Sequence, residues 1–324
     1  MKLAIIGSGK IVQDFLTITK DLPQIKLEAI VGTKRSKETL EELQKKYGIK
    51  NYFTDYEQCL QEDTIDTVYV AVPNHLHFSF TKKALLAGKN VICEKPFTTD
   101  YQQFLELKHL AESKQKFLLE AITNQYLENY LEIKKQLSSL GEIKLIECNY
   151  SQYSSRYDAF KNGEIAPAFD AQKGGGALMD LNIYNVHFVV GLLGKPLEVY
   201  YFPHMEKEVD TSGILVLQYK EYQAVCIAAK NSDAPVRSVI QGENRSIVVD
   251  SPANVLTSFG IYQKNQLLET ISANSHAHRM YQEFAMFDQM IQSKDFFAMQ
   301  KQLKHSETVM WVIDQAKLST KSRN

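Results

Sequence analysis

The segment LAIIGSGKIVQDF (residues 3–15) decides the fold. An apolar run ends in two glycines separated by one serine, and a helix-compatible pattern follows directly. This order predicts a strand, a tight turn and a helix whose first N–H groups can bind the phosphates of a dinucleotide. Gly7 permits the turn, Gly9 lets a phosphate approach the main chain, and Lys10 and Ile11 are further candidates for the cofactor site. The alternative is an ordinary strand–turn–helix junction without a ligand.

Strand and helix patterns alternate through the first 122 residues. Segments such as TVYVAV (67–72) are apolar on both faces, which is typical of a parallel sheet covered by helices on both sides. We therefore expect a doubly wound, dinucleotide-binding Rossmann domain over residues 1–122. Its expected strands are Leu3–Ile6, Leu27–Val31, Val68–Val72, Asn90–Cys93 and Phe117–Ile122, and its expected helices are Ile11–Lys20, Ser36–Tyr47, Phe78–Ala87 and Tyr101–Gln115.

The pattern changes after residue 122. Alternating segments such as GILVLQYK (213–220) and YQAVCIAAK (222–230) follow one another closely, which favours an antiparallel sheet. We expect residues 123–324 to form an α+β domain on a mostly antiparallel sheet, with the last helix packing back on the first domain. The expected helices are Asn129–Ser139, His278–Ser293 and Met299–Leu318.

The composition argues against several functional classes. The 324 residues carry a net charge of −1 with acids and bases mixed along the chain, so no nucleic-acid partner is expected. No apolar run approaches the roughly 18 residues of a membrane span, and the N-terminal run is too short for a signal-peptide core. The four cysteines are far apart without a CxxC pair, which indicates free thiols, a cytoplasmic location and no metal site.

The end of the second expected strand indicates which dinucleotide binds. A site for NAD usually places an acid there to hold the ribose hydroxyls. This chain instead has Gly32, Thr33, Lys34 and Arg35, and two cations with a hydroxyl suit a 2′-phosphate better. NADP(H) is therefore favoured over NAD(H). The alternative is a solvated charge pair near a helix start.

Polar clusters follow two further strands, in VAVPNHLHF (70–78) and VICEKPF (91–97). Ligands of an open parallel sheet bind beyond the carboxyl ends of its strands. Pro73 stops the first strand, and Asn74 could meet the nicotinamide ribose. His77 is a further candidate for the cofactor site, although a loop histidine is more often structural.

Lys95 is the strongest candidate for a catalytic base. Desolvation and the charge of a cationic nicotinamide would favour its neutral form, which can take a proton from a substrate hydroxyl while a hydride leaves the adjacent carbon. Glu94 could orient this lysine within the cofactor site, and Pro96 is a candidate for a cis peptide bond. The alternative is a surface Glu–Lys pair at a strand tip.

A polar stripe interrupts the apolar helical segment KGGGALMDLNIYNVHFVVGLLG (173–194). Asp180, Tyr184 and His187 follow at i, i+4 and i+7, which places them on one face of a helix. Asp180 could fix a substrate hydroxyl or hold Lys95, Tyr184 could relay a proton, and His187 could touch the substrate. The alternative gives Asp180 only a helix-dipole role and makes Tyr184 a core aromatic residue.

A loop rich in hydroxyl groups, YSSRYDAF (153–160), precedes that helix. Arg156 within it could contact the substrate or a cofactor phosphate. A solvated loop explains the same residues equally well.

The order of these motifs resembles a known family. GSGKIV (7–12), VAVPNHLH (70–77), EKP (94–96) and GGGALMDLNIY (174–184) together resemble the glucose–fructose oxidoreductase / inositol dehydrogenase (Gfo/Idh/MocA) family over essentially the whole chain. The resemblance implies a Rossmann domain and a substrate domain with an open-faced sheet that often mediates dimers. It therefore implies a homodimer or a dimer of dimers.

The resemblance also implies catalytic roles for Lys95, Asp180 and Tyr184. Inositol dehydrogenases carry histidine where this chain has Tyr184, so the chain looks more like the dihydrodiol dehydrogenase and glucose–fructose oxidoreductase branches. Two positions depart from the pattern. Val12 replaces the third glycine of the turn, and Asn182 replaces a glycine of the second-domain helix.

The resulting expectation is an NAD(P)-dependent oxidoreductase acting on CH–OH groups. It would transfer a hydride between nicotinamide and a secondary alcohol or carbonyl of a sugar, polyol or cyclic diol. Two alternatives stay open: an NAD-dependent glycosidase of the same superfamily, and a non-catalytic NADP-binding sensor.

Overall fold

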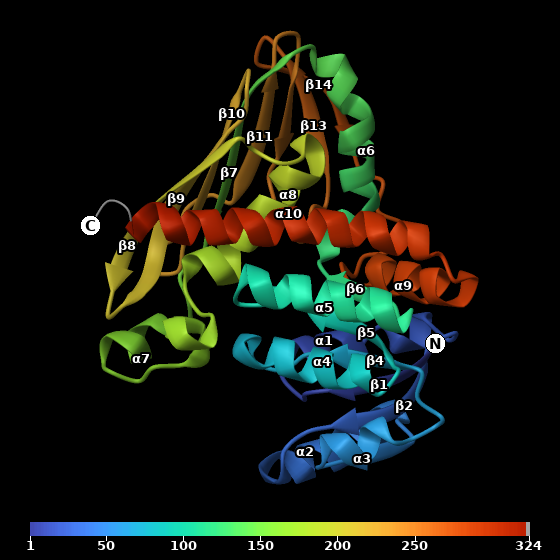
Figure 1. The fold of residues 1–324 in the computed structure, drawn as a ribbon. Coiled ribbons are helices and arrows are strands. Elements are labelled where there is room, and N and C mark those ends of the chain that lie inside the picture. Colours follow the sequence, from blue (N-terminus) through green and yellow to red (C-terminus); the bar gives the residue numbers. More distant parts are fainter. Residues whose placement is uncertain (322–324) are drawn as a thin grey trace. The chain divides into compact units, whose positions relative to one another are not determined.

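The computed structural model describes residues 1–321, which form two compact units. Unit 1 consists of Met1–Ala121 together with Met280–Lys304. Unit 2 consists of Ile122–Arg279 together with the chain from His305 onward. Figure 1 shows the chain coloured along the sequence, with the elements labelled.

The sheet of unit 1 has six parallel strands in the order β3-β2-β1-β4-β5-β6. This is the order of a doubly wound dinucleotide-binding fold, so the predicted Rossmann domain is confirmed. The strands are β1 (Lys2–Ile6), β2 (Lys26–Val31), β3 (Asn51–Phe53), β4 (Thr67–Val70), β5 (Asn90–Glu94) and β6 (Leu118–Ala121). Sequence patterns missed only β3 among these strands, because it is short and half-exposed at the edge of the sheet.

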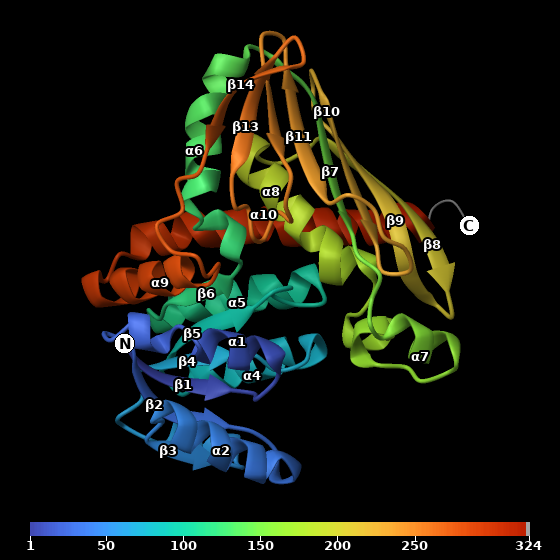
Figure 2. The same cartoon turned by 180° about the vertical axis from the view of Figure 1, so that it is seen from behind.

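The helices of unit 1 cover both faces of its sheet (Figures 1 and 2). They are α1 (Lys10–Leu16), α2 (Lys37–Tyr47), α3 (Tyr56–Leu60), α4 (His77–Leu86), α5 (Tyr101–Lys114), α9 (Tyr281–Ser293) and the start of α10 (Phe296–Lys321). The aromatic core joins both ends of the chain, since the ring centre of Phe284 in α9 lies 4.1 Å from that of Phe15 in α1 and 5.1 Å from that of Tyr69 in β4.

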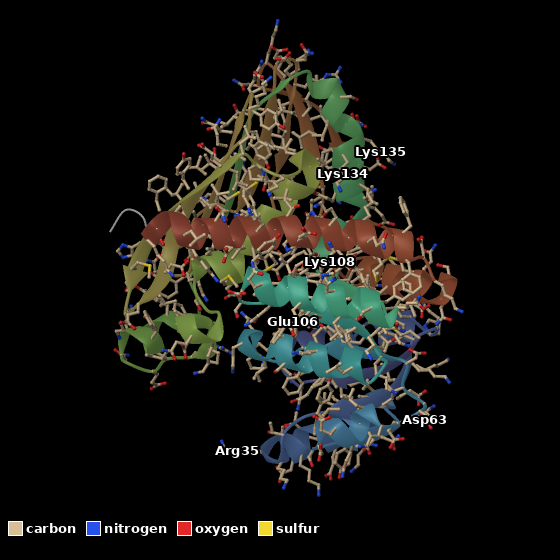
Figure 3. All side chains as sticks on the ribbon, in the orientation of Figure 1. Arg35, Asp63, Glu106, Lys108, Lys134 and Lys135 are labelled. Carbon is tan, nitrogen blue, oxygen red and sulfur yellow. The ribbon has the colours of Figure 1, made fainter. Side chains whose placement is uncertain are left out.

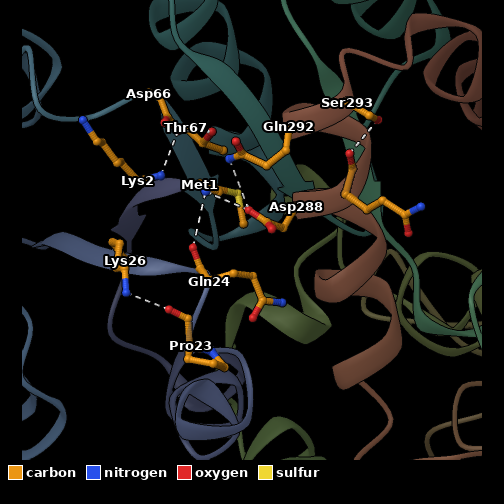
Figure 4. A network of polar contacts seen from close by, with 11 residues as sticks. Met1, Lys2, Pro23, Gln24, Lys26, Asp66, Thr67, Asp288, Gln292 and Ser293 are labelled. Carbon is orange, nitrogen blue, oxygen red and sulfur yellow. Dashed lines mark hydrogen bonds and ion pairs between the residues drawn. The ribbon is translucent and has the colours of Figure 1, made fainter.

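The first residue is tied to the same C-terminal segment (Figure 4). The Met1 amino group lies 2.7 Å from Asp288 Oδ1 in a buried ion pair. Lys2 N–H donates to Asp66 Oδ1 at 3.0 Å, which connects β1 to the loop before β4. These bonds lie at the start of β1. The glycine turn follows the opposite, carboxyl end of that strand.

Unit 2 is built on an eight-stranded sheet in the order β14-β13-β12-β11-β7-β10-β9-β8. Only the neighbours β7 and β10 run parallel; the other pairs are antiparallel, so the predicted α+β architecture is confirmed. The strands are β7 (Ile143–Ser151), β8 (Glu198–Glu206), β9 (Val209–Gln218), β10 (Gln223–Ala229), β11 (Arg237–Gly242), β12 (Ser246–Val249), β13 (Phe259–Gln263) and β14 (Gln266–Ile271).

One face of this sheet packs against α8 (Ile183–Leu193). Figures 1 and 2 show α8 along the sheet, and Asn185 Nδ2 donates to the carbonyl oxygen of Ile227 in β10 at 3.0 Å. The other helices of the unit are α6 (Glu128–Gln136), α7 (Tyr157–Lys161) and the rest of α10. The opposite face of the sheet has no helix on it within the described part of unit 2.

The segment before α8 differs from the single helix that periodicity predicts. Leu178–Asn182 forms a π-helical turn, and α8 begins only at Ile183. By length and composition Ala171–Leu193 could cross a membrane, contrary to the expectation that no stretch could. However, 72% of its most apolar window is buried inside the protein, as in the core helix of a globular fold.

Candidate active site

The glycine turn follows β1 at the carboxyl edge of the unit 1 sheet. Gly7 has φ of +121°, and a Cβ atom there would overlap the carbonyl oxygen of Ala71 after β4. Its N–H donates to the carbonyl oxygen of Val31 at 2.8 Å, which joins the ends of β1 and β2. The fold itself therefore requires glycine at position 7.

Gly9 has a different reason to be glycine. Its φ of −72° suits any residue, and a Cβ atom there would meet no protein atom within 4 Å. Gly9 is the N-cap of α1 and its open side faces away from the protein. Space beside exposed helix N–H groups fits a phosphate close to the main chain. Val12, which departs from the expected glycine, is fully buried in the core.

A cavity of about 850 Å³ opens at this edge of the sheet. Its size lies within the range of small-molecule sites. Its lining includes five of the predicted cofactor residues, namely Gly7, Gly9, Thr33, Lys34 and Pro73. Lys10, Ile11, Arg35, Asn74, His77 and Glu94 are not part of this lining.

The turn that follows β2 carries two cations, which suit an anion, and no acid that would suit ribose hydroxyls. Thr33 and Ser36 form a capping box, in which Thr33 N–H donates to Ser36 Oγ at 2.9 Å. Lys34 and Arg35 in this turn are exposed, and Figure 3 shows Arg35 projecting outward from the ribbon. No acid stands at the end of β2 itself.

Two acids of the α3 region do line the cavity, but both are already engaged. Asp55 Oδ1 accepts from Glu57 N–H at 2.9 Å and so caps α3. Glu57 pairs with Lys83 of α4 at 2.6 Å. Lys34 therefore remains in the cavity lining as a cation that suits a 2′-phosphate.

His77 connects the chain after β4 with the chain after β5. Its Nδ1 lies 2.8 Å from the carbonyl oxygen of Pro96, and its Nε2 lies 2.8 Å from that of Val72. The ring is almost completely buried, and burial lowers its pKa. These contacts make His77 a brace between two strand ends.

Lys95 follows β5 directly and is half-buried. Its positive charge acts on His77 and contributes to the lowered pKa of that histidine. The peptide bond between Lys95 and Pro96 is cis, as the sequence led us to expect. Glu94 before it is buried and accepts a hydrogen bond from the Tyr69 hydroxyl in the neighbouring strand β4.

Asp180 and Tyr184 lie in the π-helical turn and the first turn of α8 in unit 2. Asp180 is about one-third exposed, and its Oδ2 lies 2.8 Å from Nζ of the buried Lys230. Tyr184 is nearly buried, with its ring 5.9 Å from that of Tyr150 in β7. The carbonyl oxygen of Tyr184 accepts from Asn124 Nδ2 at 3.0 Å.

Comparisons with known proteins identify the family. The oxidoreductase family with an NAD-binding Rossmann fold, Gfo/Idh/MocA, matches residues 1–121, and its C-terminal domain matches residues 130–248. The scyllo-inositol 2-dehydrogenase (NADP(+)) of Bacillus subtilis is 30% identical over 98% of this chain and 96% of its own length. The chain belongs to the Gfo/Idh/MocA oxidoreductase family.

The chain is also similar to a second curated protein and to a solved structure. A trans-1,2-dihydrobenzene-1,2-diol dehydrogenase of Xenopus tropicalis is 29% identical over 77% of this chain and 75% of its own. The crystal structure of a 3-ketoreductase from Actinomadura kijaniata, solved with NADP and TDP-benzene, superposes with a TM-score of 0.87. It covers 98% of this chain and 97% of its own at 20% identity, which supports the fold alone.

The two predicted substrate residues of this Gfo/Idh/MocA chain, His187 and Arg156, lie in different surroundings. His187 is fully buried, and its Nδ1 lies 2.8 Å from Nε2 of His305 on α10. The spacing predicts that His187 and Asp180 share one face of a helix. Because His187 is buried and Asp180 is partly exposed, the two side chains do not line one accessible surface. Arg156 is exposed before α7, and its N–H donates to Ser154 Oγ at 3.3 Å.

Sequence reasoning missed the partner of Asp180. Lys230 directly follows the apolar strand QAVCIAA, just as Lys95 follows the apolar strand of β5. That signal was present in the sequence, since a cation at the end of a buried strand needs a partner. Among residues 1–321, no group of three or more metal-ligating side chains is found.

Proposed function

We propose that this chain transfers a hydride between NADP(H) and a secondary alcohol or carbonyl of a sugar, polyol or cyclic diol. The observation that carries the proposal is the position of Lys95 directly after β5, at the carboxyl edge of the parallel sheet. The glycine turn after β1 opens at the same edge. Open α/β sheets bind their ligands there, so a proton acceptor and a cofactor turn belong to one edge of one unit.

The predicted enzyme class and the predicted preference for NADP(H) are confirmed by the relatives. The full-length relative from Bacillus subtilis is named as an NADP(+)-dependent dehydrogenase of scyllo-inositol. The residues of this chain fit that cofactor, because Gly9 leaves open space at the start of α1 and β2 ends in Thr33 and Lys34 without an acid. Among these residues, Lys34 would hold the 2′-phosphate.

Lys95 is proposed as the proton acceptor. When bound, the nicotinamide accepts a hydride from an alcohol or donates one to a carbonyl. Lys95 takes the hydroxyl proton as the C–H bond breaks and the C=O bond forms, and returns it in the reverse reaction. Burial lowers the pKa of His77, which reduces the positive charge at this ring beside Lys95.

Asp180 and Tyr184 are proposed to act on the same substrate as Lys95. Asp180 would accept a hydrogen bond from a substrate hydroxyl, because it is ion-paired and still about one-third exposed. Tyr184 would relay the proton between Lys95 and solvent through its phenol group. These roles extend the sequence-based assignment and remain proposals.

We also propose that the enzyme forms a homodimer through the outer face of the unit 2 sheet. An apolar band crosses three strands there, since Phe202 pairs with Ile214 and Ile214 with Ile227. Phe202 is 50% and Ile214 44% exposed. In a two-fold dimer the apolar band of one copy would pack against the same band of the second copy, so a second copy would cover both bands at once.

Residues 1–122 would then be the cofactor domain, and residues 123–324 the substrate-binding and dimerisation domain. A cytoplasmic location is part of the proposal. It is supported by the four cysteines, all of which are buried as free thiols.

A spectrophotometric screen tests the proposed function. Purified protein is mixed with NADPH or NADP⁺ and a panel of sugars, polyols and cyclic diols, together with their ketones. The proposal predicts stoichiometric oxidation or reduction of the cofactor with at least one member. Substrate cleavage without net cofactor change would instead indicate a glycosidase. Tight NADPH binding without any turnover would indicate a sensor.

A further inference from the structure

Lys230 is a buried cation inside unit 2. Only 2% of it is exposed, and its Nζ donates to Asp180 Oδ2 at 2.8 Å and to the carbonyl oxygen of Ala168. The ammonium also lies 4.4 Å from the centre of the Phe169 ring, in a cation–π contact. A lysine is almost never this deeply buried without partners of this kind.

The segment that carries Asp180 is fixed from a second side by Asp210. The Leu178 N–H at the start of the π-helical turn donates to Asp210 Oδ2 at 2.7 Å, and the Tyr201 hydroxyl donates to the same oxygen at 2.6 Å. A Cβ atom on Gly176, where φ is +109°, would overlap the Asp210 carboxylate. The π-helical turn therefore has a defined start, and Lys230 holds its one carboxylate.

The charge of Lys230 reaches both carboxylates. Burial raises the pKa of Asp210, and Lys230 is among the groups that oppose this rise. A buried network of this kind is stable only when its charges are balanced and its donors satisfied. Without the ammonium, Asp180 would lose this ion-pair partner and Asp210 would lose a positive charge that lowers its pKa.

We propose that Lys230 is a positioning residue that holds the Asp180 carboxylate in place for the substrate through their ion pair. This inference rests on the proposed function, in which Asp180 accepts a hydrogen bond from the substrate. Lys230 acts through Asp180 and not on the substrate itself, because only 2% of Lys230 is exposed whereas Asp180 is about one-third exposed. Ala168 and Phe169 also tie the loop before the π-helical turn to the same ammonium.

The test compares Lys230→Met with Asp180→Asn and with the double variant. We expect Lys230→Met to lower kcat/KM by about 10- to 100-fold, as small displacements of catalytic groups do. The acid limb of its pH profile should move to higher pH, because an unpaired carboxylate protonates more readily. In the Asp180→Asn background, the same substitution should lower kcat/KM little further. Additive losses, or an unmoved acid limb, would overturn the inference.

Lys89 provides the matched control. It is also buried, and its Nζ donates to the carbonyl oxygens of Glu62 and Ile65, at 2.9 and 2.8 Å. Lys89→Met should lower thermal stability without moving the acid limb. Lys230→Arg keeps the charge, so it should restore part of the lost kcat/KM if Lys230→Met itself folds poorly.

Hydrogen exchange separates this inference from the proposed function. In the full chain, Lys230→Met should speed amide exchange in residues 168–182 and leave β1–β5 unchanged. Asp180→Asn should speed exchange in the same residues, and the double variant should add little. If the wild type turns over no panel member, the proposed function fails while this exchange test still decides the coupling. If turnover is normal and Lys230→Met changes neither exchange nor pH profile, only the positioning role fails.

Discussion

His77 Nδ1 lies 2.8 Å from the carbonyl oxygen of Pro96, the residue that follows Lys95. The second ring nitrogen lies 2.8 Å from the carbonyl oxygen of Val72. A buried side chain on α4 thus holds together the two strand ends that are expected to face the cofactor. The geometry therefore gives His77, a residue of the motif VAVPNHLH, a structural role in the support of these two strand ends.

This relationship predicts the behaviour of His77→Ala. The change removes the ring that contacts the carbonyl oxygens of Pro96 and Val72, so it should cost about 1–3 kcal/mol of unfolding free energy. It should also lower kcat, because the chain around Lys95 loses its brace. Urea unfolding and steady-state kinetics measure both effects. His75, an exposed neighbour, is the control, and His75→Ala should change neither quantity. A normal kcat in His77→Ala would reduce the residue to a purely stabilising role.

Alanine should affect the two glycines of the turn differently: at Gly7 it should mainly lower stability, and at Gly9 it should mainly lower NADPH affinity. Gly7→Ala forces a side chain into a positive φ and against Ala71, so it should destabilise the protein by about 3 kcal/mol or more. Gly9→Ala meets no protein atom and should cost at most about 1 kcal/mol as a poorer N-cap. Its NADPH affinity should nevertheless fall, because the methyl group occupies the space kept for phosphate. Thermal unfolding and NADPH fluorescence titration measure the pair. Unchanged NADPH affinity in Gly9→Ala would contradict the phosphate assignment.

Lys34 should determine the choice between NADP(H) and NAD(H). Lys34→Asp removes a charge-assisted bond to the 2′-phosphate, worth about 1.5–3 kcal/mol, and adds an acid suited to ribose hydroxyls. We expect about 10- to 100-fold weaker NADPH binding and a gain in NADH binding. Lys37→Asp is the control, since Lys37 is exposed nearby but does not line the cavity. Equal effects of the two substitutions would indicate a nonspecific charge effect.

The outer face of the unit 2 sheet should set the oligomeric state. Phe202→Glu places a charge in the middle of the apolar band, so a dimer formed through this face should dissociate. Light scattering after gel filtration measures the mass. Leu86 is similarly exposed, on unit 1, and Leu86→Glu should leave the mass unchanged. A monomeric wild type, or a dimer that survives Phe202→Glu, would contradict this interface.

Much of the fold follows from local sequence patterns. The strands β1, β2, β4, β5 and β6 lie within two residues of their expected bounds, and the first four are apolar runs followed by glycine, proline or charge. The edge strand β3 gave no such signal, since its three residues are exposed or half-buried. The π-helical turn at Leu178–Asn182 was also invisible to periodicity, because it depends on Asp210, a residue distant in sequence.

The candidate site was predictable in part for the same reason. Lys95 and Gly9 stand in short motifs whose local chemistry indicates their surroundings. The environments of His77, His187 and Lys230 depend on partners that only folding brings near, namely Pro96, His305 and Asp180. Sequence patterns identified candidates, and the three-dimensional contacts separate the braces from the residues proposed for chemistry.

The central claim is that Lys95 moves the proton during NADP(H)-dependent hydride transfer. The most direct measurement is the single-turnover rate of cofactor conversion in Lys95→Ala, with NADPH affinity measured on the same sample. The account predicts a rate lower by orders of magnitude and nearly unchanged NADPH affinity, because Lys95 is not part of the cavity lining that we propose for the cofactor. A wild-type rate in Lys95→Ala, on a substrate that the wild-type enzyme converts, would contradict it.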